Sequence, residues 1–153
     1  MIYKSKGQSS LELLMVVGLA LVILVPSTIL FVNYAQNTAT EVSVSQINLI
    51  GQRLLNTASE MKGAGSNSWT TLEINFPENV IDMTIFNSVN ETDLIILYDT
   101  PSGHSELVFF GTRFRLDNGT TSCEGYCSVN VTPGVNSIRV ASHSTGVSIK
   151  KVS

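Results

Sequence analysis

Residues 13–32 read LLMVVGLALVILVPSTILFV, and this stretch decides the architecture of the chain. Its twenty residues carry no charge, and only Ser27 and Thr28 interrupt the apolar run with polar side chains. At 1.5 Å per residue, a helix of this length spans about 30 Å, which is the hydrocarbon thickness of a bilayer. The stretch therefore predicts a helix that can cross a membrane.

The flanks of the apolar run indicate its orientation and its fate. Lys4 and Lys6 precede it and no basic cluster directly follows, so we expect a cytoplasmic N-terminus and an exported remainder. A cleaved secretory signal has an apolar core of about 7 to 15 residues followed by an Ala-x-Ala site. Here the run is longer and no convincing site follows it. We expect the helix to stay in the mature protein, with cleavage behind it as the minor alternative.

Pro26 lies inside the apolar run and allows two interpretations. Proline removes a helical hydrogen bond and tends to kink a helix. Either Pro26 ends one helix and Ser27 begins another, or the helix bends there so that subunits can pack around an axis.

A helical pattern continues beyond residue 33. Apolar residues recur at spacings of 3, 4, 4 and 3, which is typical of one apolar helix face. They are Ile47, Ile50, Leu54, Ala58 and Met61. The sequence thus predicts a helix over residues 8–62, with an apolar part at 8–35 and an amphipathic part at 36–62 that packs on the rest of the protein.

The remaining chain consists of short segments rich in Val, Ile, Thr and aromatic residues, separated by turn residues, a pattern typical of strands. The predicted strands are 69–76, 80–86, 93–98, 106–116, 128–131, 137–141 and 147–152. Their spacing favours an antiparallel sheet or a small β-sandwich over a parallel sheet. We therefore predict an α+β fold of lollipop shape, with a long N-terminal helix and a β-rich head at residues 69–153.

Glu12 stands immediately before the apolar run, where a carboxylate is costly without a partner. One explanation is that Glu12 lies in the first helical turn, with Ser9 or Ser10 as the N-cap. The other is that it pairs with a positive group outside its own chain. The sequence alone leaves both open.

Residues 6–14 read KGQSSLELL. They resemble the class III signal of archaeal type IV pilin-like proteins, in which a short basic leader ends in Gly, the mature chain begins Gln-x-Ser-x-Glu, and a long apolar helix follows. Gln8, Ser10 and Glu12 match this pattern, and Lys6 and Gly7 lie just ahead of it. The resemblance covers only the first 35 residues.

The resemblance implies that a membrane-embedded prepilin peptidase cleaves between Gly7 and Gln8 and removes the leader, residues 1–7. Glu12 would then be the fifth residue of the mature chain. In related filaments, a carboxylate at that position neutralises the amino group of a neighbouring subunit. This gives Gln8 and Glu12 a role in assembly, unless Gln8 cyclises to pyroglutamate, which has no charged amine.

The resemblance also implies a function: a pilin, the structural subunit of a homo-oligomeric helical filament on the cell surface that serves adhesion. Its precursor would be inserted in the cytoplasmic membrane and handled by pilus assembly machinery. The alternative is a membrane-tethered cell-surface binding module, or a minor or tip pilin outside the main polymer.

Cys123 and Cys127 are the only cysteines, and in an exported domain they most simply form a disulfide. The alternative is a metal site completed by His104 and His143, although neither histidine has metal-site spacing to a cysteine. We expect no metal and no cofactor.

Three Asn-x-Ser/Thr sequons, at Asn90, Asn118 and Asn130, predict N-glycosylation, with Asn118 the best candidate because it lies in a predicted turn.

Composition argues against two other classes of protein. Only 14% of the residues are charged, the net charge is -3 and no basic block occurs, so we expect no nucleic-acid partner.

Ser102, His104 and Glu106 are close in sequence, but a catalytic triad is assembled across a fold and not from neighbouring residues. No nucleophile, phosphate-binding or metalloprotease motif accompanies them. We predict that the protein is not an enzyme.

Overall fold

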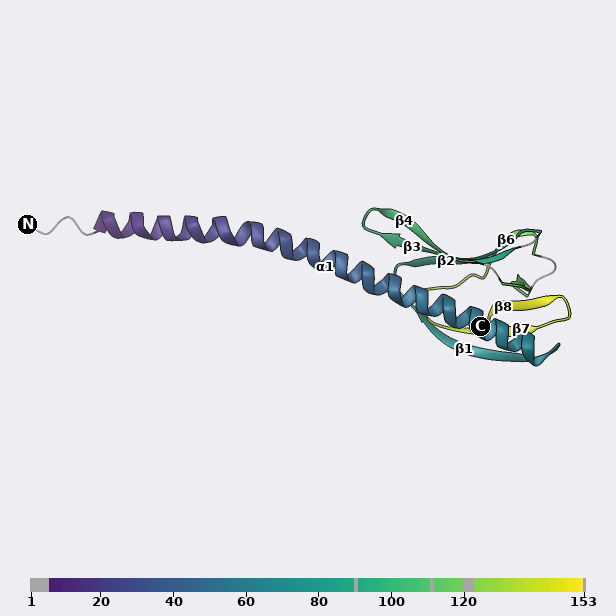
Figure 1. Ribbon diagram of the computed structural model, residues 1–153. Coiled ribbons are helices and arrows are strands. Elements are labelled where there is room, and N and C mark those ends of the chain that lie inside the picture. The colour runs from purple at the N-terminus through teal and green to yellow at the C-terminus, as the bar shows by residue number, and fades with distance from the viewer. Residues whose placement is uncertain (1–5, 90, 111, 120–122, 153) are drawn as a thin grey trace, which may run out of the picture. The chain divides into compact units, whose positions relative to one another are not determined.

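The computed structural model describes residues 6–89, 91–110, 112–119 and 123–152. One long helix, α1 (Lys6–Ala64), precedes eight strands (Figure 1). The strands are β1 (Trp69–Phe76), β2 (Val80–Asn87), β3 (Thr92–Thr100), β4 (Gly103–Phe109), β5 (Arg115–Asp117), β6 (Gly125–Ser128), β7 (Gly134–Ser142) and β8 (Gly146–Val152). The predicted α+β class is confirmed. The chain divides into two compact units, residues 1–39 and 40–153, and α1 contributes to both.

In the first unit, α1 remains helical through Pro26. Proline has no amide hydrogen to donate, so one helical hydrogen bond is missing there. The next two residues use their hydroxyl groups within the helix: Ser27 donates to the carbonyl of Ile23 at 2.7 Å and Thr28 to that of Leu24 at 2.8 Å. The interpretation that Pro26 ends one helix and Ser27 begins another is therefore wrong.

The helix ends two residues later than predicted, at Ala64. The next residue, Gly65, has a φ of 105°, in the left-handed region that glycine enters without steric cost. A left-handed glycine just after the last helical residue is a common helix terminus. The chain then enters β1 at Trp69.

The second unit contains two four-stranded sheets, which we call sheet 1 (order β1-β7-β8-β5) and sheet 2 (order β4-β3-β2-β6). All pairs in sheet 2 are antiparallel, with a register shift between Val80 and Asp82. In sheet 1, β5 pairs with β8 in parallel. The expectation of purely antiparallel pairing is thus wrong at one edge, where a three-residue strand arrives from sheet 2.

Most predicted strands shift by one to three residues at one or both ends, and two of them differ from the observed strands in more than their ends. The predicted strand 106–116 is two strands in different sheets, because the chain leaves sheet 2 after Phe109 and joins sheet 1 at Arg115. The predicted strand 128–131 is displaced, since β6 ends at Ser128. Asn130, with a φ of 58°, interrupts the extended backbone there, although Val129 and Val131 on either side are buried. Alternating apolar residues therefore marked burial at this point and not a strand.

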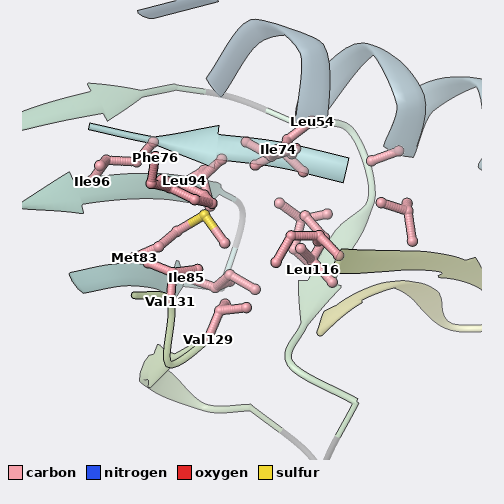
Figure 2. Packing of buried hydrophobic residues seen from close by; sticks show 14 of the residues in the cluster. Leu54, Ile74, Phe76, Met83, Ile85, Leu94, Ile96, Leu116, Val129 and Val131 are labelled. Carbon is pink, nitrogen blue, oxygen red and sulfur yellow. The ribbon is translucent and has the colours of Figure 1, made fainter. Parts of the chain in front are cut away.

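A single hydrophobic cluster joins the second unit's part of α1 to both sheets (Figure 2). The predicted helical stripe lies in it, with Ile47, Leu54 and Ala58 fully buried and Ile50 and Met61 packed against it. The sheets contribute buried residues from alternate strand positions. These are Ile74, Phe76, Met83, Ile85, Leu94, Ile96, Tyr98, Leu116, Ile138, Val140, Val147 and Ile149.

Gly51 allows a close approach between α1 and the Phe109 ring of sheet 2. A Cβ atom placed on this buried glycine would lie against the ring of Phe109 in β4. The helical spacing places Gly51 between Ile47 and Leu54 on the buried face. Only a residue without a side chain leaves room for the Phe109 ring there.

We predict that Gly51→Ala destabilises the second unit by about 1–3 kcal/mol relative to Gly63→Ala, because the added methyl group overpacks the contact with Phe109. Gly63 is also in α1, and a Cβ there meets nothing within 4 Å. Both changes bring the same gain in helix propensity, so their difference isolates the clash. Urea unfolding of the detergent-solubilised chain measures it, and equal stabilities would contradict the predicted contact.

Candidate functional site: an exposed apolar helix

The apolar part of α1 is exposed along its entire length. Sixteen large apolar side chains between Leu11 and Val32 are each 45% to 79% exposed, and none of them contacts a core. Burying one such side chain is worth about 1.5–3 kcal/mol. A set of this size exceeds the whole stability of an ordinary domain, about 5–15 kcal/mol, so water cannot be the working solvent of this segment.

The helix is suited to a lipid environment. It is long and apolar enough to cross a membrane, and the window that meets this test has none of its residues buried. Apart from the hydrogen bond that is missing at Pro26, its backbone groups are paired within the helix, as a bilayer requires. The hydroxyls of Ser27, Thr28 and Thr38 also donate to carbonyls one turn earlier, so these polar groups are satisfied without water. The segment is therefore compatible with membrane insertion.

Glu12 is exposed at the N-terminal end of this segment. The helix begins at Lys6 and its first turn contains no acidic residue, so Ser9 and Ser10 lie inside the helix and are not its N-cap. The N-cap explanation for Glu12 is thus wrong for the chain as it stands. No described residue forms a hydrogen bond or ion pair with Glu12, which leaves its carboxylate available to a group from elsewhere.

The predicted processing residues lie next to one another at the start of α1. Gly7 and Gln8 belong to its first turn, while residues 1–5 of the predicted leader lie outside the described residues. Cleavage between Gly7 and Gln8 would make Gln8 the new helix N-terminus. Glu12 would then lie one turn from the new amino group, since a helical turn has 3.6 residues.

The predicted disulfide between Cys123 and Cys127 is confirmed, with the two Cα atoms 5.9 Å apart. The bonded sulfurs are not available as thiolate ligands, which removes the basis of the alternative metal site. His104 instead pairs with Asp99, and His143 Nε2 lies 3.0 Å from the hydroxyl of Ser148. Within the described ranges, no three His, Cys, Asp or Glu side chains converge as metal ligands would.

The three residues considered for catalysis lie in the β3–β4 hairpin. Ser102 is in the turn, and its hydroxyl lies 3.1 Å from that of Thr100. His104 is 70% exposed and contacts Asp99 instead of Ser102. Among the described residues, no contact joins Glu106 on β4 to either residue, so the hairpin does not bring the three groups together.

The amide of Asn87 is a structural centre that sequence analysis missed. Its Nδ2 donates to the carbonyl oxygens of Leu116 and Cys123, at 2.7 and 3.2 Å, and its Oδ1 accepts a hydrogen bond from Thr92 at 2.7 Å. Arg115 donates to the same Cys123 carbonyl at 2.6 Å. These bonds hold the disulfide loop through its backbone. The only sequence signal was an Asn at the end of a predicted strand, where a turn residue is ordinary.

We predict that Asn87→Ala costs about 3 kcal/mol of the free energy of unfolding, because it removes the side-chain donor to the Leu116 carbonyl and the acceptor of the Thr92 hydroxyl. Loss of the disulfide in Cys123→Ser/Cys127→Ser should cost about 2 kcal/mol, since the closed loop contains only five residues. Asn75→Ala, at an exposed position on β1, is the control and should stay within about 0.5 kcal/mol of the wild type. Urea unfolding checks the order, and a larger loss from the disulfide variant would contradict it.

The three predicted glycosylation sites differ in access. Asn90 lies outside the described residues. Asn118 is half-buried, and its Nδ2, the atom that would carry the glycan, donates to the Ser128 carbonyl at 3.1 Å. Asn130 is exposed and lies beyond the end of β6, not within the predicted strand. Between the two described sequons, the geometry favours Asn130 over Asn118.

We predict higher glycan occupancy at Asn130 than at Asn118 in protein from the native host. Peptide mass spectrometry before and after deglycosylation measures both, with Asn130→Gln as the control for site assignment. A glycan on Asn118 with an unmodified Asn130 would show that access in the folded head does not decide occupancy.

No protein-family model matches the chain, and no curated protein or solved structure matches it at a significant level. Inference about its function therefore depends on its own residues and geometry. The strongest feature is the exposed apolar segment with Glu12 as its only charged residue between positions 10 and 35.

Proposed function

We propose that this protein is a pilin, the structural subunit of an archaeal type IV pilus-like surface filament that serves adhesion. The observation that carries the proposal is the apolar surface of α1 between Leu11 and Val32, which no other part of the described chain covers. Such a surface needs lipid or other helices around it. The resemblance of residues 6–14 to a class III signal favours one environment after the other. Lipid surrounds the helix before assembly, and copies of the same helix surround it afterwards.

In this proposal the precursor lies in the cytoplasmic membrane, and the prepilin peptidase cuts it between Gly7 and Gln8. The apolar helices then leave the bilayer and pack side by side in the filament core. This exchange keeps the apolar side chains away from water throughout, so it needs no ligand, metal or cofactor. The head, residues 69–153, faces solvent and meets the surface to which the filament adheres.

Glu12 would set the register of this packing. An isolated carboxylate among apolar helices is costly, whereas one paired with an ammonium group is tolerated. Glu12 has no partner among the described residues, and cleavage creates an amine at Gln8. We assign that amine, from a neighbouring subunit, as the partner of Glu12.

Purification of surface-sheared material from the native host tests the proposed function, with cryo-EM of any fibres. The expected result is a filament whose core density fits α1 and whose subunits begin at Gln8. Recovery of the chain only as monomers from detergent-solubilised membranes would overturn the proposal and support the membrane-tethered binding module.

We predict that Glu12→Ala lowers the yield of sheared filaments by tenfold or more, because an unpaired amine in the core costs at least about 1.4 kcal/mol per subunit. Glu60→Ala removes an exposed acid from the other end of α1 and should leave the yield unchanged. Immunoblots of the sheared and membrane fractions measure both variants.

The membrane fraction should contain processed Glu12→Ala protein, which separates failed assembly from failed cleavage. Mass spectrometry of the mature terminus shows whether Gln8 keeps a free amine. Wild-type filament yield from Glu12→Ala, or pyroglutamate at every terminus, would rule out the proposed pair.

A further inference from the structure

The two sheets of the second unit carry opposite charge. The four strands of sheet 2 contain Asp82, Asp93, Asp99 and Glu106, and no Lys or Arg occurs within them. The strands of sheet 1 contain four basic residues, Arg115, Arg139, Lys150 and Lys151, against two acidic ones, Glu73 and Asp117. The composition of the whole chain conceals this separation, because its net charge is only -3.

The outer face of sheet 2 is apolar as well as acidic. Ile95 and Leu97 alternate along β3 with fully buried Leu94 and Ile96, so they point to the opposite face. The β3–β4 register places Val108 beside Ile95 and Glu106 beside Leu97. This surface, which we call the acidic face, thus combines an apolar band with acidic side chains beside it.

Two aromatic residues extend the acidic face towards β6. Phe86 and Tyr126 are register partners, and their ring centroids are 4.6 Å apart. Tyr126 is nevertheless 72% exposed. An exposed aromatic side chain on a partly apolar patch is typical of a protein–protein interface.

The outer face of sheet 1 carries the basic residues Arg139 and Lys150, and the register places Glu73 and Asp117 on the same side. Thr71, Arg139 and Lys150 occupy one cross-strand row over β1, β7 and β8, on the side opposite the buried residues. Arg139 lies over the ring of Trp69, 4.7 Å from its centroid, and Trp69 is 62% exposed. We call this surface the basic face.

The chain itself satisfies the charges of the two faces to different extents. Asp82 accepts hydrogen bonds from the Met83 amide and from the hydroxyls of Thr84 and Ser128, and Asp99 pairs with His104. Arg139 and Lys150 are direct cross-strand partners, and like charges in that arrangement repel. No described residue forms an ion pair with Arg139, Lys150 or Glu106. On the acidic face, one row places Asp82 and Glu106 on either side of Leu97. The row on the acidic face therefore carries negative charges, and the row on the basic face carries positive ones.

We propose that the acidic face of one protomer packs on the basic face of a second copy, and that this contact joins neighbouring heads along the filament. The inference rests on the proposed function. The two faces are different surfaces of the same molecule, so the contact is heterologous. A heterologous contact repeats from copy to copy, and it builds an open helical filament when its rotation does not close into a ring.

The size of the faces limits the strength of this contact. The strands contain 27 residues in sheet 1 and 28 in sheet 2, and at about 3.3 Å by 4.8 Å per residue each face covers roughly 440 Å². A total near 900 Å² is at the low end for specific interfaces, where contacts are weak and transient. The head contact therefore selects register, while burial of the apolar helices supplies most of the assembly energy.

Charge reversal in the full-length protein tests the proposal. Glu106→Lys and Lys150→Glu should each lower the yield of sheared filaments about tenfold, since like charges would then meet across the contact. The double variant Glu106→Lys/Lys150→Glu restores opposite charges and should recover the yield. Glu78→Lys, at an exposed position in the β1–β2 turn, is the control and should assemble normally.

The outcomes separate the two proposals. Absence of fibres from the wild type itself overturns the proposed function, together with the contact that rests on it. Normal fibres from both single variants leave the pilin function in place and overturn the head contact. Recovery in the double variant supports the heterologous contact specifically, whereas a fault in folding would add in the double variant and not cancel.

Crosslinking gives a second, independent readout. Val108→Cys and Ser137→Cys place a thiol on the acidic and the basic face respectively. Treatment of filaments with a bis-maleimide should produce a ladder of multimers only when both substitutions are in one chain. Dimers from either single variant would show that like faces meet, and this would overturn the heterologous contact.

Discussion

The structure depends on the removal of one apolar surface from water. Sixteen large side chains of α1 between Leu11 and Val32 are exposed in the isolated chain, and their transfer out of water outweighs the stability of an ordinary domain. This surface runs along the whole segment and ends at a single carboxylate, Glu12. A lipid bilayer or a bundle of identical helices can remove this surface from water, because both are apolar over the required length. The proposed function uses both, one after the other.

The same helix meets a second requirement in its C-terminal part. Ile47, Leu54 and Ala58 are fully buried in the cluster that joins α1 to both sheets, and Gly51 brings the backbone close to Phe109. Here the apolar residues form one stripe, and in the first unit they surround the helix. An all-round apolar pattern suits a helix that is surrounded by lipid or other helices. A stripe suits a helix with a folded core on one side and water on the other. A single unbroken backbone thus connects two parts of the protein that need different surroundings.

The sequence predicted the features that depend on local pattern. The apolar run, the stripe from Ile47 to Met61 and β1 at residues 69–76 followed from periodicity and turn residues, and the disulfide followed from two cysteines in a domain expected to be exported. Periodicity failed where tertiary pairing decides the structure. The chain changes sheets after Phe109 although its residues still favour a strand, and Val129 and Val131 are buried outside any strand. For the candidate site, Gly7, Gln8 and Glu12 were recognisable from a local motif. The separation of charge between the sheets was not, because it depends on which strands lie together.

Helix burial alone leaves a filament underspecified. Apolar side chains attract one another without direction, so a bundle of such helices can slide in register or rotate at little cost. Direction must come from polar groups, whose energy depends on the partner that they meet. Glu12 offers one such group at the end of the helix, and the acidic and basic faces offer others in the head. Only 14% of the residues are charged, so few other charges compete with these groups for partners. In the proposed filament, the low charge density would therefore allow close stacking of copies and leave the remaining charges to determine how the copies are arranged.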